Sequence, residues 1–168
     1  VFDFDGIFTN NKVFINQEGL ESVQCDRADG LGINILKKYI KKKNIEIEIF
    51  ILSKEKNKVV LSRSNKLDLD CKHGIDNKLM FLMNYLNQRF GENKISPKNL
   101  LYMGNDLNDL ESIIYSGFSI CPNDSHELIK KYSSITLNSN GGEGFVREAI
   151  ELLIRLNELE YNELIEFI

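Results

Sequence analysis

Two aspartates separated by one residue end a short hydrophobic stretch at the start of the chain, in Asp3-Phe4-Asp5-Gly6. Side chains at alternate positions of a strand share a face, so both carboxylates can converge beyond the carboxyl end of a sheet. Carboxylates so close together repel each other unless a cation intervenes, and a hard ion such as Mg²⁺ suits oxygen ligands. The motif therefore predicts a metal-assisted reaction site, although a surface turn with two acids has the same sequence.

Three more groups that could do chemistry follow strand-like runs. Ser53 ends the apolar stretch Ile49-Phe50-Ile51-Leu52, and its hydroxyl could bind an anion or cap the next helix. Lys78 stands at the start of a predicted helix, where a solvated surface role is the ordinary alternative. Gly104-Asn105-Asp106-Leu107-Asn108-Asp109 brings several oxygen ligands to another helix start, where acids also act as caps.

Short β-rich runs alternate with helical patterns, which indicates repeated βαβ units and an α/β fold with a largely parallel sheet. The predicted strands are Val1 to Phe4, Ile45 to Leu52, Asn99 to Met103, Gly117 to Ile120 and Ser134 to Leu137. Apolar residues at three- and four-residue spacing predict helices over Leu31 to Lys43, Lys56 to Leu67, Asp76 to Phe90, Asp106 to Tyr115 and Gly144 to Leu159.

The segment Lys12 to Asp26 differs from this layout. Two β-rich runs flank Asn16-Gln17-Glu18-Gly19, a turn in which the glycine tolerates positive φ. The pattern predicts a β-hairpin inserted after the first strand, at about residues 11–26. We find no internal repeat, and we expect residues 1–168 to form a single domain.

Composition narrows the function. The chain has 168 residues, 42% of them hydrophobic and 27% charged, and its longest apolar runs are far too short to span a membrane. Its net charge of −4 argues against a nucleic-acid partner, which would require a basic surface. A small anionic substrate remains compatible, because a local cluster of cations can bind it whatever the net charge.

The cysteines and the first residues indicate the redox environment of the protein and the position of its natural N-terminus. Cys25, Cys71 and Cys121 are odd in number and widely spaced, so we expect buried, reduced thiols in a cytoplasmic protein. Only Val1 and Phe2 precede Asp3, whereas a buried strand has about five residues. We therefore expect that the natural N-terminus lies upstream of Val1.

The order of these four groups resembles the four motifs of the haloacid dehalogenase superfamily. The groups are Asp-x-Asp, then Ser, then Lys, and then Gly-Asn-Asp-x-x-Asp. The resemblance implies a capless, Rossmann-like three-layer sandwich and a Mg²⁺-dependent phosphatase. It implies that Asp3 is the nucleophile, Asp5 the general acid and base, and Ser53 and Lys78 the groups that bind the phosphoryl oxygens. The Mg²⁺ ligands that it implies are Asp3, the backbone carbonyl of Asp5, and oxygens of the turn that contains Asn105, Asp106 and Asp109.

Asn105 departs from this pattern, because family members commonly have Asp directly after the glycine of the fourth motif. An amide oxygen can still ligate Mg²⁺, but it brings one negative charge fewer. Asp106 or Asp109 would then compensate, and the sequence leaves open which of these residues ligates the ion.

The spacing between motifs leaves no room for a cap domain, and longer stretches narrow the resemblance to capless sugar-phosphate phosphatases. These enzymes act on 3-deoxy-octulosonate 8-phosphate or 2-keto-3-deoxynonulosonate 9-phosphate, and the C-terminal domain of some N-acylneuraminate cytidylyltransferases is similar to them. The group implies a homotetramer in which the hairpins meet and a neighbour helps to cover each site. The stretches that carry it are Phe4 to Asn10, Cys25 to Ile33, Leu52 to Asn57 and Gly141 to Glu148.

The residues after Ser53 favour the nine-carbon substrate. Glu55, Arg63 and Lys66 fall within about 80° of one another on a helix, and they resemble the substrate-selecting residues of the nonulosonate phosphatases. Gly6 completes the predicted substrate contacts. A salt-bridged, solvated helix face is the alternative for the trio. For the protein, the alternatives are an octulosonate phosphatase or a non-catalytic oligomerisation domain of a cytidylyltransferase.

Overall fold

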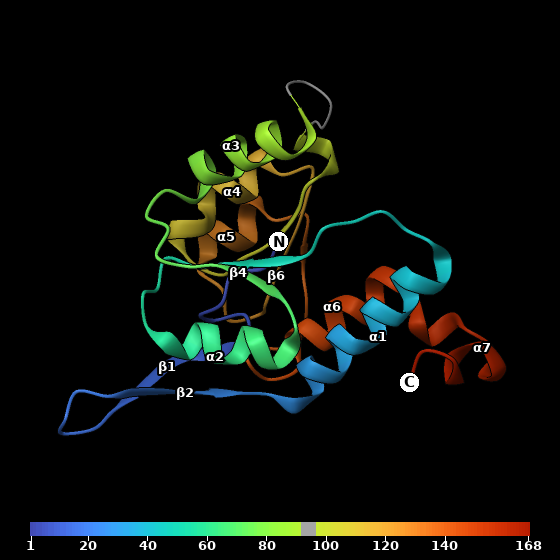
Figure 1. Cartoon of the computed structure of the whole chain (residues 1–168), viewed down its shortest axis with the longest axis horizontal. Helices are drawn as coiled ribbons and strands as arrows, with labels where there is room; N and C mark the ends of the chain where they lie inside the picture. Colours follow the sequence, from blue (N-terminus) through green and yellow to red (C-terminus); the bar gives the residue numbers. More distant parts are fainter. Residues whose placement is uncertain (92–96) are drawn as a thin grey trace.

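A parallel β-sheet runs through the middle of the computed structural model, which describes residues 1–91 and 97–168 (Figure 1). Its central position is taken by the chain at Phe2, which forms parallel bridges to Ile51 on one side and Met103 on the other. The order across the sheet is β4 (Asp70–Lys72), β3 (Phe50–Leu52), Phe2, β5 (Leu101–Met103), β6 (Phe118–Cys121) and β7 (Ile135–Thr136).

In this order, the side of the sheet on which new strands are added changes next to Asp3, the first candidate catalytic residue. After Phe2 the chain adds β3 and β4 on one side of the sheet, then crosses over and adds β5, β6 and β7 on the other. Open α/β sheets bind ligands at the carboxyl end of such a switch. Asp3, whose backbone N–H donates to the Met103 carbonyl at 2.8 Å, lies at this point.

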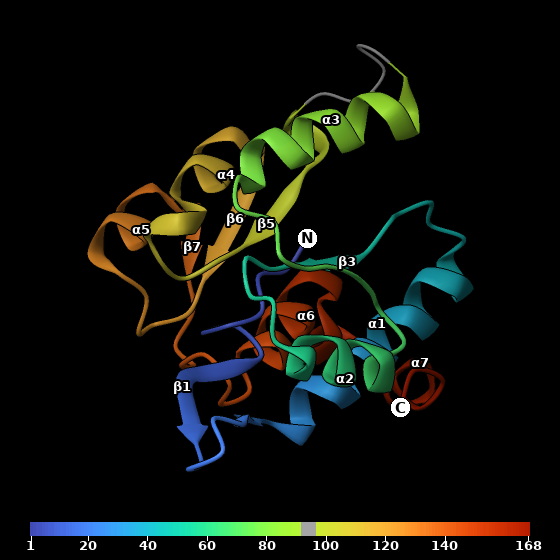
Figure 2. The same cartoon turned by 60° about the vertical axis from the view of Figure 1, so that its left-hand side comes forward.

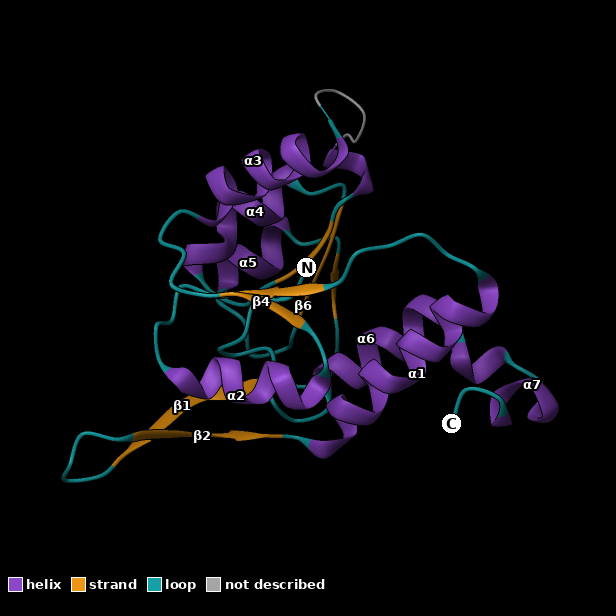
Figure 3. Ribbon diagram, in the orientation of Figure 1, coloured by secondary structure: helices purple, strands orange, loops and turns teal. Residues whose placement is uncertain are grey.

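Helices cover both faces of the sheet (Figures 2 and 3). One layer contains α1 (Arg27–Lys43), α2 (Lys58–Leu67), α6 (Phe145–Ile154) and the short α7 (Tyr161–Ile165). The other contains α3 (Lys78–Phe90), α4 (Leu110–Tyr115) and α5 (Glu127–Tyr132). Three short 3₁₀ turns connect elements at Pro97–Asn99, Leu107–Asp109 and Leu156–Glu158. In the described part of the chain no helix is long and apolar enough to cross a membrane.

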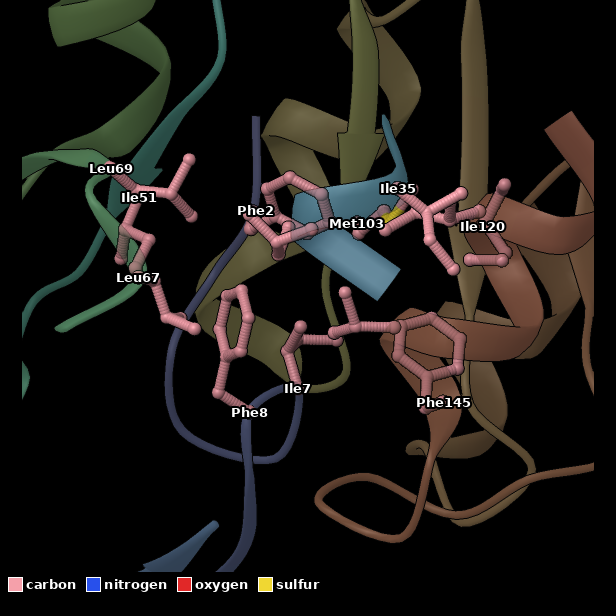
Figure 4. Packing of buried hydrophobic residues seen from close by; sticks show 14 of the residues in the cluster. Phe2, Ile7, Phe8, Ile35, Ile51, Leu67, Leu69, Met103, Ile120 and Phe145 are labelled. Atoms are coloured by element: carbon pink, nitrogen blue, oxygen red, sulfur yellow. The ribbon is translucent and has the colours of Figure 1, made fainter. Parts of the chain in front are cut away.

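The inner strands β3 and β5 are buried on both faces, which explains their uninterrupted apolar sequences. Ile51 and Met103 face the layer of α1, α2 and α6, whereas Leu52 and Tyr102 face α3, α4 and α5. Figure 4 shows the first cluster, in which Phe2 lies near Met103 and Ile51. Alternation along each strand thus divides the core into two clusters.

A β-hairpin leaves this sandwich after the first strand. It consists of β1 (Thr9–Ile15) and β2 (Glu21–Cys25), which pair in antiparallel fashion with Val13 opposite Val23. The hairpin extends away from the helical layers in Figure 1. Its outer residues Val13, Phe14, Ile15 and Leu20 are 52–68% exposed.

The predicted α/β class and the hairpin are confirmed, and the element boundaries differ for local reasons. Helix α1 begins at Arg27 rather than Leu31, because the Asp26 carboxylate accepts a hydrogen bond from the Ala28 N–H at 2.7 Å and caps the helix. Helix α6 ends at Ile154 instead of Leu159, because Arg155 adopts a left-handed conformation. The strand predicted from Ile45 begins only at Phe50. The short helices α5 and α7 were not predicted, since five or six residues show too little periodicity.

Asp29, in the first turn of α1, joins this helix to α6. Its side chain is fully buried, and one carboxylate oxygen accepts a hydrogen bond from the Arg147 N–H at 3.0 Å. Arg147 lies in the first turn of α6, whose preceding residue Gly144 has no side chain to cap it. The second carboxylate oxygen is buried without a hydrogen bond in the described structure. Burial raises the pKa of Asp29 to about 6.

We predict that Asp29→Asn changes the pH dependence of stability. Because the folded-state pKa of about 6 lies above the ordinary 3.8, the folded protein holds this proton more tightly, and the contribution of Asp29 falls by about 3 kcal/mol as the pH rises from about 4 to about 6. The variant lacks this loss but keeps an amide oxygen for the Arg147 N–H. Relative to wild type, its free energy of unfolding should rise by about 2 kcal/mol between pH 4.5 and 7, the part of the total change that falls in this range.

Urea denaturation at several pH values measures this difference. Asp70→Asn is the control, because a hydrogen bond from Lys72 lowers the pKa of the exposed Asp70 and no such rise should follow. A stability difference for Asp29→Asn that is independent of pH would contradict the prediction.

Candidate active site

The four sequence motifs meet at the carboxyl edge of the sheet, around a cavity of about 580 Å³. Asp3 and Asp5 follow the central strand, Ser53 follows β3, and the turn after β5 contributes the remaining oxygen atoms. The described motif residues that line the cavity are Asp3, Asp5, Ser53, Asn105 and Asp106.

A buried ammonium group shared by two carboxylates forms the floor of the site. The Nζ atom of Lys78, the first residue of α3, lies 2.6 Å from Asp3 Oδ1 and 2.7 Å from Asp109 Oδ1. The three side chains are at most 5% exposed. The hydroxyl of the buried Tyr102 also donates to Asp109 Oδ1, at 2.8 Å. The solvated surface role that the sequence left open for Lys78 is therefore wrong.

The charges in this cluster do not balance. Burial and the neighbouring Asp109 raise the pKa of Asp3, and Lys78 only partly opposes this rise. Burial alone would lower the pKa of Lys78, but the two carboxylates raise it, so the ammonium group stays charged. One cation for two buried carboxylates leaves one negative charge, which a second cation at Asp3 would neutralise.

Asp109 holds the fourth motif together. Besides Lys78 and Tyr102, it accepts hydrogen bonds at its second oxygen from the backbone N–H groups of Asn105 at 3.1 Å and Asp106 at 3.4 Å. These four donors match the roughly four lone-pair positions of a carboxylate. The geometry thus argues against Asp109 as a direct metal ligand, one of the options that the sequence left open.

Asn105 presents the free oxygen that a hard cation needs. Its side chain is 7% exposed, and in the part of the chain that the structure describes its Oδ1 atom is buried without a hydrogen bond. No three carboxylate, imidazole or thiol side chains among the described residues are grouped as a metal site. The residues present nevertheless fit Mg²⁺ through Asp3, the Asp5 carbonyl and Asn105 Oδ1, with Asp106 at the rim.

Gly6 allows the first and fourth motifs to approach this closely. Its φ angle is +75°, and a Cβ atom there would lie 1.9 Å from Nδ2 of Asn105. From the other side Gly141 contacts it, since a Cβ atom on Gly141 would lie 1.9 Å from the Gly6 carbonyl oxygen. Gly6 was expected to contact substrate, but it is buried beneath these residues and shapes the site from behind.

Asp5 is suited to proton transfer. It is partly buried and lines the cavity. Burial and the negative charges of Glu55 and Glu21 raise its pKa, whereas Lys78 and Thr9 act in the opposite direction. A carboxyl group with a raised pKa can hold a proton nearer neutral pH and donate it to a leaving group.

The predicted substrate trio does not share a helix face. Helix α2 begins at Lys58, so Glu55 lies in the preceding loop and the assumption of one helical arc is wrong. Glu55 lines the cavity, but Arg63 donates to the Asp26 carbonyl at 2.8 Å and Lys66 is exposed, and neither lines it. Sequence reasoning missed the other side chains that line the cavity, which are Asn11, Lys54, Lys56, Asp76 and Asn108.

Comparisons with known proteins agree with this geometry. No family model matches the chain. Among curated proteins, the 3-deoxy-D-manno-octulosonate 8-phosphate phosphatase KdsC of Escherichia coli K12 is 28% identical over 155 residues, which cover 92% of this chain and 77% of that protein.

Two solved structures are more similar in sequence. One, assigned to the HAD family of hydrolases, from Streptomyces avermitilis, is 34% identical with a TM-score of 0.79, and the match covers 89% of this chain and 86% of that one. The chain belongs to the haloacid dehalogenase (HAD) superfamily. The second structure is the 3-deoxy-D-manno-octulosonate 8-phosphate phosphatase from Moraxella catarrhalis in complex with Mg²⁺, phosphate and KDO. It is 30% identical, with a TM-score of 0.80, over 92% of this chain and 83% of that one.

This HAD chain is a phosphoric monoester hydrolase of the capless group. Only the hairpin, α1 and β3 lie between the first motif and Ser53, and only α2 and β4 lie between Ser53 and Lys78. Both segments are completely described, and neither contains a cap domain. The resemblance inferred from the four motifs is thus confirmed.

We predict that Asp3→Asn abolishes turnover without unfolding the protein. The variant loses the attacking oxygen, but one carboxylate and one ammonium group remain in the cluster, so no buried charge is left alone. Its free energy of unfolding should stay within about 1 kcal/mol of wild type. Phosphate release and urea denaturation measure the two effects.

Lys78→Met is the matched variant, because it leaves two buried carboxylates without a cation and should cost about 3–5 kcal/mol. Near-normal activity of Asp3→Asn would exclude Asp3 as the nucleophile. Equal destabilisation by both substitutions would show that the shared ion pair is not the basis of the cluster.

Proposed function

We propose that this chain is a Mg²⁺-dependent phosphatase that removes the terminal phosphate of a 3-deoxy-2-keto sugar acid, with the eight-carbon octulosonate 8-phosphate as the first candidate substrate. The Lys78 cluster at the cavity floor carries the proposal, because it holds a carboxylate nucleophile beside a cation and a free oxygen ligand. The curated relative and the Moraxella catarrhalis enzyme support the eight-carbon substrate over the nine-carbon one that the sequence favoured.

Asp3 would attack phosphorus with one carboxylate oxygen, while the bond from phosphorus to the sugar oxygen breaks. Asp5 would give its proton to the leaving sugar oxygen and then take a proton from the water that hydrolyses the aspartyl-phosphate, a role typically worth about 10²–10⁴ in rate. Ser53 and Lys78 would bind the phosphoryl oxygens. A bound Mg²⁺, held by Asp3, the Asp5 carbonyl and Asn105, would offset repulsion between the carboxylate and the phosphate dianion.

A nine-carbon nonulosonate 9-phosphate is the second candidate. The observation that favours it is Glu55, which follows Ser53 and Lys54 and lines the cavity. Octulosonate phosphatases more often have a Gly-Arg pair directly after the second motif, and this chain lacks that pair.

A phosphate-release assay with both sugar-acid phosphates tests these candidates. We expect hydrolysis with Mg²⁺, none with EDTA, and a higher kcat/KM for the eight-carbon substrate. Because Asp5 supplies a proton, Asp5→Asn should lower kcat by about 10²–10⁴. Absence of release from either sugar-acid phosphate would contradict the proposal, and a preference for the nine-carbon substrate would reverse the order of the candidates.

We also propose that four chains assemble through their hairpins, so that a neighbour helps to cover each site. The side chains of Phe14 and Ile15 are 62% and 63% exposed in the single chain. A two-stranded hairpin is marginally stable alone, and an apolar surface of this kind gains free energy when a second copy covers it. Asn57, the N-cap of α2, holds the start of β2 through a hydrogen bond that its side-chain amide donates to Glu21 at 2.8 Å.

Sedimentation analysis tests the assembly. We expect a tetramer for wild type and smaller species for Phe14→Ser, because a hydroxyl group at the contact removes apolar burial worth about 2 kcal/mol in each chain. Ile114→Ser is the control, since Ile114 is 57% exposed on α4, on the other helical layer. A monomeric wild type, or equal effects of the two substitutions, would exclude assembly through the hairpin.

A further inference from the structure

The wall of the cavity carries two cations that the catalytic mechanism does not use. Lys54 and Lys56 line the cavity directly after Ser53. Among the described residues they are the only lysines or arginines that line the cavity. Lys78 lies beneath the cavity and is not part of its lining. Neither ammonium group has an ion-pair partner in the described structure. The other charged groups on the lining are acids, namely Asp3, Asp5, Glu55, Asp76 and Asp106.

The backbone that bears these lysines is held by hydrogen bonds. The Glu55 N–H donates to Ser53 Oγ at 3.0 Å, and the Glu55 carboxylate accepts from the N–H groups of Lys56 at 2.7 Å and Asn57 at 2.8 Å. Across the wall, the Gly74 N–H donates to the Glu55 carbonyl at 2.9 Å. Binding therefore need not order this loop, and only the two flexible side chains lose freedom.

Glu55 and Lys56 consequently differ in what they can offer a ligand. One oxygen of Glu55 is already engaged by two backbone N–H groups, so this side chain serves the loop that carries the lysines. The stem of Lys56 lies beside Gly74, whose Cβ position would be 3.4 Å from it. Any side chain at position 74 would press against the Lys56 stem, so the glycine allows Lys56 to keep its position.

The other two cations that the sequence assigned to the substrate do not line the cavity. The Arg63 guanidinium donates to the Asp26 carbonyl, it lies 3.5 Å from the Cβ position of Gly30, and its Nε atom is buried without a partner in the described structure. Lys66 is exposed and does not line the cavity. Within one chain, a second anion on the substrate would therefore meet Lys54 and Lys56.

We propose that Lys54 and Lys56 are specificity-determining residues that bind the carboxylate of the sugar acid. The inference rests on the proposed function, in which the phosphate end of the substrate occupies Asp3, Ser53 and Lys78. An acid-lined wall repels an anionic sugar tail unless cations offset it, and these two lysines are the cations in place. Arg63 then acts as a brace between α2 and the start of α1.

The test compares two substrates across matched variants. Octulosonate 8-phosphate has a carboxylate, whereas ribose 5-phosphate has none. We expect Lys54→Ala and Lys56→Ala each to lower the ratio of the two kcat/KM values by about 10-fold, and the double variant to lower it by about 100-fold, as for lost charge-assisted contacts. Replacement of both by Arg should retain most of the ratio. Lys58→Ala is the control, because Lys58 is exposed near the same loop but does not line the cavity.

A second measurement keeps the inference testable without turnover. Free 3-deoxy-octulosonate, titrated into the protein with Mg²⁺ and phosphate and followed by NMR, should bind more weakly to the double variant than to wild type and to Lys58→Ala. Failure of wild type to hydrolyse any sugar phosphate would overturn the proposed function, whereas this binding difference would still stand.

Three results would overturn the role of the lysines. The first is an unchanged substrate ratio together with unchanged binding in the double variant. The second is an equal loss on both substrates, which would place the lysines at the phosphate. The third is a loss of the ratio in Arg63→Ala or Lys66→Ala but not in the lysine variants, which would assign the carboxylate to a site completed by a neighbouring subunit.

Discussion

The site depends on one buried ammonium group that two carboxylates share. Lys78 lies within 2.7 Å of both Asp3 and Asp109, and all three side chains are almost completely withdrawn from solvent. Such an arrangement is costly unless every charge is compensated, and it leaves one negative charge over. Asp3, the candidate nucleophile, lines the same cavity as Asn105, whose side-chain oxygen has no hydrogen bond in the described structure. The same imbalance of charge would favour a divalent cation beside Asp3.

The rest of the fold serves to bring these groups together. Asp3 leaves the middle of the sheet, Lys78 begins α3, and Asp109 follows β5, so the cluster joins three segments across the point at which strand order changes direction. The close approach of backbone segments at two glycines completes the site. Gly6 and Gly141 lie so near to their neighbours that a methyl group on either would overlap other atoms. Rigidity at the floor contrasts with the wall, where the side chains of Lys54 and Lys56 have no ion-pair partner among the described residues.

The absence of a cap domain gives the wall and the hairpin their importance. A cavity of about 580 Å³ that is open on one side cannot exclude water by itself. Recognition of an anionic sugar must then come from side chains on the wall and, in the proposed assembly, from a neighbouring chain. Two features of the chain could meet this need. One is the exposed apolar surface of the hairpin, and the other is the pair of lysines in the loop after Ser53. In the two proposals the first would supply a cover, and the second would supply positive charge.

The amino-acid sequence by itself determined the α/β class, the hairpin, the missing cap and the four motifs, because these depend on local periodicity and on the order of polar residues at strand ends. It could not determine which oxygens are free. Asn105 and Asp109 both follow β5, but only the fold shows that Asp109 is occupied by four donors and that the Asn105 side-chain oxygen has none. Similarly, helical spacing grouped Glu55 with Arg63, although an N-cap at Asn57 starts the helix after Glu55 and a distant carbonyl holds Arg63. Periodicity places residues on an element, whereas the contacts that occupy a side chain come from segments far away in the sequence, and only the tertiary structure brings those segments together.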